Sequence, residues 1–244
     1  MRKVRMAVLG CVAFLCTSSM VFANSITWSF TPASVSSGTV GSTTSAGTVY
    51  GSTMVFNSIP SSGPGAGTIT ATGYFCGSTS VACSSTSTTS AAALFYKTGG
   101  TNETGLGLNG QTDNEIDQFD YIALDFSNVI GDKPITVTLF SVQTGEGYVA
   151  AEQAAGKAGV FGTLDSTSCV VTTSTPCADT VTFTVTKADP IIDISAANTT
   201  AGGHNVLIGS ASANSPAPEP GSLLLFGTGL SGLAVTLRRR VLKQ

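Results

Sequence analysis

The sequence predicts an all-β fold, an antiparallel β-sandwich of jelly-roll type. Short runs rich in β-branched and aromatic residues are separated by Gly, Ser, Asn and Pro, and no strong helical periodicity interrupts them. Only 10% of the 244 residues are charged, a profile common in extracellular β-rich proteins. Because no crossover helices separate the runs, a parallel α/β sheet is not expected. A helix at each end of the chain is expected to flank the sandwich.

The first of these helices is a predicted secretory signal peptide, residues 1–23. Three basic residues lie within the first five positions, residues 6–15 form an apolar h-region, and Ala23 ends a stretch suited to cleavage. We therefore expect signal peptidase to cut before Asn24 and the remainder of the chain to be exported.

Residues 24–210 are the predicted sandwich body. In the run 135–139, apolar side chains alternate with threonines, so one face can pack while the other meets water. The Ser/Thr-rich segments 34–45 and 78–90 are interpreted as long loops, with edge strands or flexible linkers as the alternatives. The candidate strands are 26–30, 48–56, 68–75, 92–96, 121–126, 135–142, 147–151, 159–164, 181–186, 191–195 and 205–208.

The body is strongly acidic. Between Asn24 and Ala217 lie four lysines, no arginine and thirteen acids, which give a formal charge of −9 against −3 for the whole chain. Because phosphate contacts dominate the affinity of proteins for nucleic acid, this charge argues against a nucleic-acid partner. Cations or neutral sugars suit such a body better.

Four cysteines remain after signal cleavage, and they allow three disulfide connectivities. We favour the local pairing because the residues between the members of each pair are rich in turn formers. A zinc site is less expected, since neither pair has the short spacing of a zinc knuckle. The pairs are Cys76 with Cys83 and Cys169 with Cys177; a link between Cys76 and Cys169 would refute this pairing.

The stretch 101–128 concentrates acidic residues. One interpretation is a solvated loop that helps to keep a weakly charged protein soluble. The other is a Ca²⁺ site, because Ca²⁺ prefers oxygen ligands from loops, although the spacing is not that of an EF-hand. No other cofactor is expected. The candidate Ca²⁺ ligands are Glu103, Asp113, Glu115, Asp117 and Asp120.

Catalysis finds little support in the sequence, and we assign no catalytic residue. His204 is the only histidine, and no Gly-x-Ser-x-Gly elbow is present. Paired carboxylates for glycoside hydrolysis remain open, because their spacing in space cannot be read from the sequence. We therefore expect a protein that is not an enzyme.

The end of the chain is organised as a linker, 211–217, and a tail, 218–244. Within the tail, residues 221–237 form an uncharged stretch that is long enough for a short transmembrane helix. The basic residues that follow should stay on the cytoplasmic side of the inner membrane. The residues that frame the helix are Pro218, Glu219 and Pro220 before it and Arg238, Arg239 and Arg240 after it.

This tail resembles the PEP-CTERM sorting signal of Gram-negative bacteria. The resemblance implies recognition by an exosortase, removal of the tail, and release to the cell surface or the exopolysaccharide matrix. The sequence therefore predicts an exported, non-enzymatic surface or matrix protein, adhesive or associated with exopolysaccharide. The alternative is a secreted polysaccharide-active enzyme that uses the same sorting route.

Overall fold

The computed structural model describes residues 25–60, 66–77, 83, 89–129, 133–142, 147–153, 177–197 and 205–214. They belong to one compact unit, Ser25–Asn214, and all of their strand pairs are antiparallel. The strands are β1 (Ser25–Ser29), β2 (Val35–Thr44), β3 (Gly47–Ile59), β4 (Thr68–Phe75), β5 (Ser90–Ala92), β6 (Leu94–Lys97), β7 (Gly105–Leu108), β8 (Asp120–Asp125), β9 (Lys133–Val142), β10 (Tyr148–Gln153), β11 (Cys177–Val185), β12 (Ile191–Ala196) and β13 (Leu207–Asn214).

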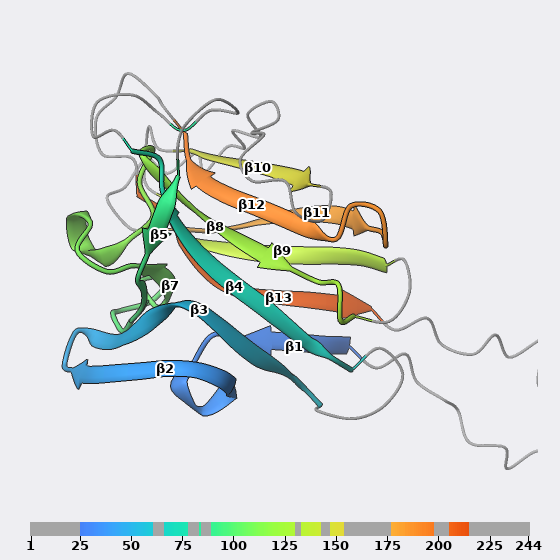
Figure 1. Cartoon of the computed structure of the whole chain (residues 1–244), viewed down its shortest axis with the longest axis horizontal. Helices are drawn as coiled ribbons and strands as arrows, with labels where there is room; N and C mark the ends of the chain where they lie inside the picture. Colours follow the sequence, from blue (N-terminus) through green and yellow to red (C-terminus); the bar gives the residue numbers. More distant parts are fainter. Residues whose placement is uncertain are drawn as a thin grey trace, which may run out of the picture. The chain divides into compact units, whose positions relative to one another are not determined.

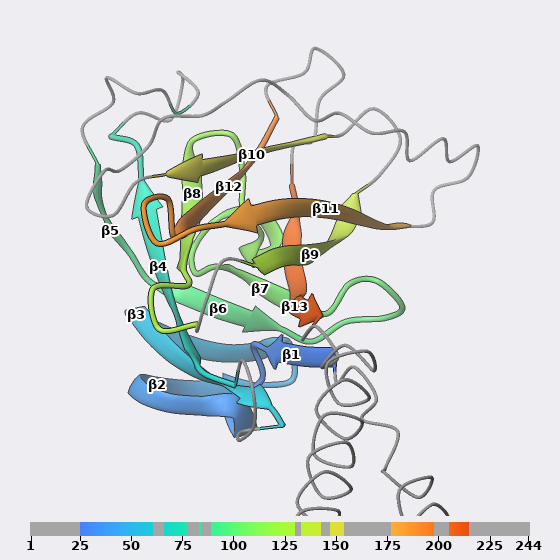
Figure 2. The same cartoon turned by 90° about the vertical axis from the view of Figure 1, so that its right-hand side faces the viewer.

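The strands form two layers that are joined through β3 (Figures 1 and 2). One layer has the order β10-β12-β8-β4-β3, with β2 beside β3 and β5 beside β4; the other has the order β6-β7-β13-β9-β11, with β1 beside β13. The long strand β3 pairs with β6 near Thr48 and with β4 near Val55, so it belongs to both layers. The predicted all-β antiparallel sandwich is thus confirmed, while its jelly-roll connectivity stays a prediction.

The core lies between the layers and is built by period-two alternation. Trp28 of β1 is fully buried, meets the ring of Phe126 edge-on at 5.8 Å between ring centres, and donates its Nε1 hydrogen to the Gly67 carbonyl over 2.9 Å. In the same core, the Tyr50 hydroxyl donates to the Phe30 carbonyl over 2.9 Å. Burying these aromatic rings stabilises the fold, and each buried polar atom named here has a partner.

Most of the segment 34–45 is the strand β2, which pairs only with β3 among the described strands, so the preferred interpretation as a long loop is wrong and the edge-strand alternative holds. Its residues are almost all exposed, so no buried face imposes the alternation by which strands are recognised. Backbone pairing with β3 nevertheless holds it in the sheet. A second strand, β7, was also not predicted. Its glycines allow close backbone approach, since a Cβ on Gly107 would lie 2.2 Å from the Asn114 carbonyl oxygen.

The predicted boundary at residue 210 also needs correction, because β13 continues to Asn214. Ala211 and Ala213 are buried, and β1 pairs with this end of the strand, so four residues of the expected linker belong to the sheet. Residues 1–24, the candidate strand 159–164 and residues 215–244 lie outside the described residues. In the described part of the chain, none of the helices is long and apolar enough to cross a membrane.

Candidate functional site

The predicted Ca²⁺ ligands do not converge on one point. Glu103 and Glu115 contact Lys97. Asp117 lies in the turn before β8 and Asp120 is the first residue of β8, whereas Asp113 is exposed. Among the residues that the structure describes, no three acids, cysteines or histidines are grouped as ion ligands would be. Four of these acids thus form two clusters with different partners, and the Ca²⁺ site stays a prediction.

The first cluster, which we call the Lys97 cluster, consists of Lys97, Glu103, Glu115 and Ser141. Lys97 Nζ donates to Glu103 Oε2 over 3.1 Å and also contacts Glu115 Oε1. The Ser141 hydroxyl lies 2.9 Å from the same Glu115 oxygen and 3.1 Å from Glu103 Oε1. With the ammonium of Lys97 between the two carboxylates, this cluster is already neutralised in part and is a poor site for a cation.

Burial and charge act against each other in this cluster. Burial is the largest influence on Glu115 and raises the pKa of its carboxyl, while Lys97 and the Ser141 hydroxyl oppose it. Burial by itself lowers the pKa of the Lys97 ammonium, but Glu115 and then Glu103 raise that pKa above its usual value. The geometry thus favours the ionised lysine.

Ser141 is held in an unusual backbone conformation to reach these carboxylates. Its φ is 62°, in the left-handed region that a serine seldom adopts. The backbone N–H of Ser141 donates to the Asn102 carbonyl over 2.8 Å, which offsets the cost of this conformation. Neither Lys97 nor Ser141 was predicted from the sequence, because each acts through residues far away along the chain.

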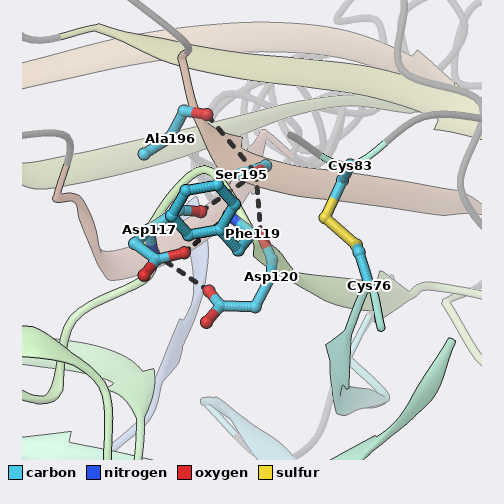
Figure 3. Close-up of a disulfide and its surroundings, with 7 residues drawn as sticks. All are labelled: Cys76, Cys83, Asp117, Phe119, Asp120, Ser195 and Ala196. Atoms are coloured by element: carbon cyan, nitrogen blue, oxygen red, sulfur yellow. Dashed lines mark hydrogen bonds between the residues drawn. A yellow bond between two sulfur atoms is a disulfide. The ribbon is translucent and has the colours of Figure 1, made fainter. Parts of the chain in front are cut away.

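The second cluster consists of the turn 117–119 and Asp120, the first residue of β8. A disulfide that follows β4 lies beside this turn (Figure 3). The predicted pair Cys76–Cys83 is present. The Cys76 N–H donates to the Phe119 carbonyl over 2.9 Å, and the Cys83 N–H donates to the Gln118 carbonyl over 3.0 Å. These two hydrogen bonds hold the disulfide loop, and with it the end of β4, against the turn before β8. Cys177 lies in β11, but Cys169 lies outside the described residues, so their pairing stays a prediction.

Asp120 is the most perturbed acid of this turn. Its side chain is fully buried, Oδ1 accepts the Asp117 N–H over 3.0 Å, and Oδ2 has no hydrogen-bond partner within the described residues. Burial, and then the charge of Asp117, raise its pKa to about 8. The Ser195 hydroxyl of β12 lies 2.7 Å from the Asp120 carbonyl and anchors the turn (Figure 3). Asp120 is thus held mainly as a neutral acid at neutral pH.

The outer face of the layer that contains β4, β8 and β12 carries hydroxyl and aromatic groups. Tyr74 and Tyr121 pair directly across β4 and β8, and their rings stack with centres 4.8 Å apart. Tyr121 is fully buried, whereas Tyr74 is half-buried. Burial, and then the charge of the buried Asp193, raise the pKa of both phenols, so both tyrosines stay protonated.

Threonines extend this face. Thr72 lies opposite Thr53 of β3, and their hydroxyl oxygens are 3.4 Å apart. Along β4, Thr70, Thr72 and Tyr74 alternate with the buried Ile69 and Ala71. That alternation is visible in the sequence and could have identified Tyr74 as an outward-facing aromatic residue. We call the set Thr53, Thr70, Thr72 and Tyr74 the hydroxyl face.

Residues 216–240 match the model of the PEP-CTERM protein-sorting motif. The chain carries a PEP-CTERM sorting motif at its C-terminus. The match contains all six residues that were predicted to frame the tail helix, Pro218, Glu219, Pro220, Arg238, Arg239 and Arg240. Such a motif implies export and sorting to the cell surface by an exosortase.

The PEP-CTERM motif covers only the tail, and the body has weaker likenesses. No curated protein matches the chain. A xylan-binding module, CBM15, is 14% identical with a TM-score of 0.34, and the alignment covers 66% of this chain and 95% of that module. The CBM22-1 xylan-binding domain of Paenibacillus barcinonensis Xyn10C is 7% identical with a TM-score of 0.30, over 59% and 94% of the two chains. A mutant of the module CBM29-2, complexed with mannohexaose, is 11% identical with a TM-score of 0.25, over 60% and 92%. At such values the likeness says nothing about what this chain binds.

Proposed function

We propose that this chain is an exported surface or matrix protein whose β-sandwich acts without catalysis as an adhesive or exopolysaccharide-associated component. The observation that carries this proposal is the sorting motif at residues 216–240, close behind a compact β unit that ends at Asn214. In this proposal signal peptidase removes residues 1–23, the tail anchors the chain briefly in the inner membrane, and an exosortase releases the body.

The sorting step is tested by replacing Arg238, Arg239 and Arg240 together with alanine. Because the basic cluster holds the end of the tail in the cytoplasm, we expect less extracellular protein and accumulation of the uncleaved chain in the membrane fraction. Immunoblots of medium and membranes from a host that has an exosortase measure both quantities. Lys243→Ala is the control, since Lys243 lies outside the matched residues. Unchanged release of the triple variant would contradict the proposal.

The polysaccharide association rests on the hydroxyl face. A half-buried tyrosine offers one ring surface to a sugar, and neighbouring threonine hydroxyls can exchange hydrogen bonds with sugar hydroxyls. Trp28, the only tryptophan, is buried in the core and offers no such surface. The four residues of the hydroxyl face carry no charge, which suits a neutral polysaccharide, and the acid nearest to them in register is Asp125, which pairs with Thr70.

Tyr74→Ala tests this contact. Loss of one aromatic surface is expected to weaken binding of the exported protein to the neutral exopolysaccharide of its host by about two- to tenfold. Affinity electrophoresis in gels that contain the polysaccharide measures the change, with Tyr96→Ala on β6 as the matched control. Equal retardation of wild type and Tyr74→Ala would remove the hydroxyl face from the proposal. Cleavage of the polysaccharide in the same mixtures would favour the alternative, a secreted polysaccharide-active enzyme.

A further inference from the structure

The distribution of charge divides the body. Residues 24–96 contain no Asp, Glu, Lys or Arg, so every charge of the body lies at or after Lys97. The uncharged part supplies β1 to β5 and nearly all of β6. Val40 and Ile59, the only large hydrophobic residues exposed among those described, also belong to it, at 46% and 59% of their possible exposure. Acidic repulsion between two copies of the body is therefore weakest where they meet through this part.

Within that part, β2 has an open edge. Among the described strands it hydrogen-bonds only to β3, and it lies at the margin of its layer (Figures 1 and 2). Nine of its ten residues are exposed. An edge strand presents a row of unpaired backbone N–H and C=O groups, and proteins usually block such a row with charged residues or proline. The ten residues of β2 include neither.

The other marginal strands are protected or short. Both β10 and β11 contain an acid, Glu152 and Asp179 respectively, and the Tyr148 hydroxyl of β10 lies 3.4 Å from the Asp179 carboxylate of β11. β5 has only three residues. Among the described strands, β2 is thus the long edge strand that contains no charged residue. It also belongs to the part of the body where electrostatic repulsion of a second copy is weakest.

We propose that β2 is a self-association edge, at which a second copy of this chain pairs its own β2 antiparallel to the first. The occupant is a second copy because the copy brings an equally long, uncharged edge, whereas an acidic or basic partner would find no opposite charge there. Antiparallel pairing of identical strands has two-fold symmetry, so it closes as a dimer and joins the two β2-containing layers into one continuous sheet.

The ladder between β2 and β3 limits the strength of this pairing. Its register shifts at three places, between Val35 and Ser37, between Gly38 and Val40, and between Val40 and Thr43. Such irregularities bend an edge strand and reduce the length that a partner can follow. The dimer is therefore weak and depends on concentration, which suits a protein that accumulates on a surface.

The test uses the exported protein, isolated as wild type and as Val40→Lys. Sedimentation equilibrium over a wide concentration range should show a monomer–dimer equilibrium for the wild type. Val40→Lys should raise the dissociation constant by about tenfold or more, because it removes an exposed apolar side chain and places like charges across the two-fold axis. Thr184→Lys on the β11 edge adds the same charge at an exposed position and should leave the equilibrium unchanged. Higher salt should strengthen the wild-type dimer by screening the acidic bodies.

Hydrogen exchange locates the contact. Amides of residues 35–44 should gain protection as the wild-type concentration rises, and those of 177–185 should not. A wild type that stays monomeric, an equal effect of both lysine variants, or protection confined to other strands would each overturn the proposal. The intact mass of the isolated protein records separately whether the sorting tail is present, so failure of the sorting proposal is distinguished from failure of this one.

Discussion

Asp120 begins β8 and shares a face of that strand with the buried Ile122 and Leu124. A carboxyl in such surroundings favours its neutral form, which is why its pKa rises from the ordinary value of 3.8 to about 8. The folded protein therefore holds a proton that the unfolded chain has released, and stability must depend on pH between these two values.

The sign of that dependence gives a prediction. Since the folded state binds more protons between about pH 4 and pH 8, the free energy of unfolding should fall as the pH rises through this window. Asp120→Asn retains the shape and removes the ionisation, so it should gain about 1–3 kcal/mol relative to wild type between pH 4 and pH 8. Urea unfolding of both proteins at several pH values measures this gain, with Asp125→Asn as the control in the same strand. A constant difference between variant and wild type across the window would contradict the assignment.

At the scale of elements, the Lys97 cluster ties three strands together. Lys97 ends β6, Glu103 and Glu115 flank β7 on either side, and Ser141 lies near the end of β9. The Glu115 side chain is only 4% exposed, so its carboxylate depends on Lys97 for compensation, whereas the Glu103 side chain is 22% exposed and can be partly hydrated.

Removing the lysine should thus cost more than removing the pair. Lys97→Met leaves Glu115 buried without its cation, and we expect a loss of about 2–3 kcal/mol, below the values for fully buried pairs because Lys97 keeps some contact with water. The double variant Lys97→Met with Glu115→Gln should regain most of that loss. Denaturant unfolding of wild type, both single variants and the double variant completes the cycle. A double variant as unstable as the sum of the single variants would contradict this account.

Alternation predicted the strands that bury one face, such as β4, β8, β9 and β12, because apolar side chains recur there with period two. Alternation did not identify β2, because its residues are exposed on both faces. It also missed β7, because two of its four residues are glycines, which have no side chain to show which face is buried. Local spacing sufficed for Cys76 and Cys83 because their loop is short. The partners of the acids could not be predicted, since Lys97, Ser141 and Ser195 reach them only after the strands have paired.

At the scale of the whole molecule, the segments divide the tasks. The sorting motif at 216–240 is a linear signal and was read from sequence without any knowledge of the fold. The body, Ser25–Asn214, is a compact unit. Residues 25–96 carry no charge, and all charged residues of the body lie at or after Lys97, so these two parts suit different kinds of partner. Release from the membrane is what would allow the uncharged edge and the hydroxyl face to reach their partners.

In the proposed function, removal of the tail releases the body from the membrane. The most direct measurement is mass spectrometry of the C-terminal peptide of the protein isolated from the cell surface or medium of a host that has an exosortase. We expect a peptide that ends near Pro218, Glu219 and Pro220 and lacks residues 223–237. Extracellular protein in which residues 223–237 are still attached would contradict it.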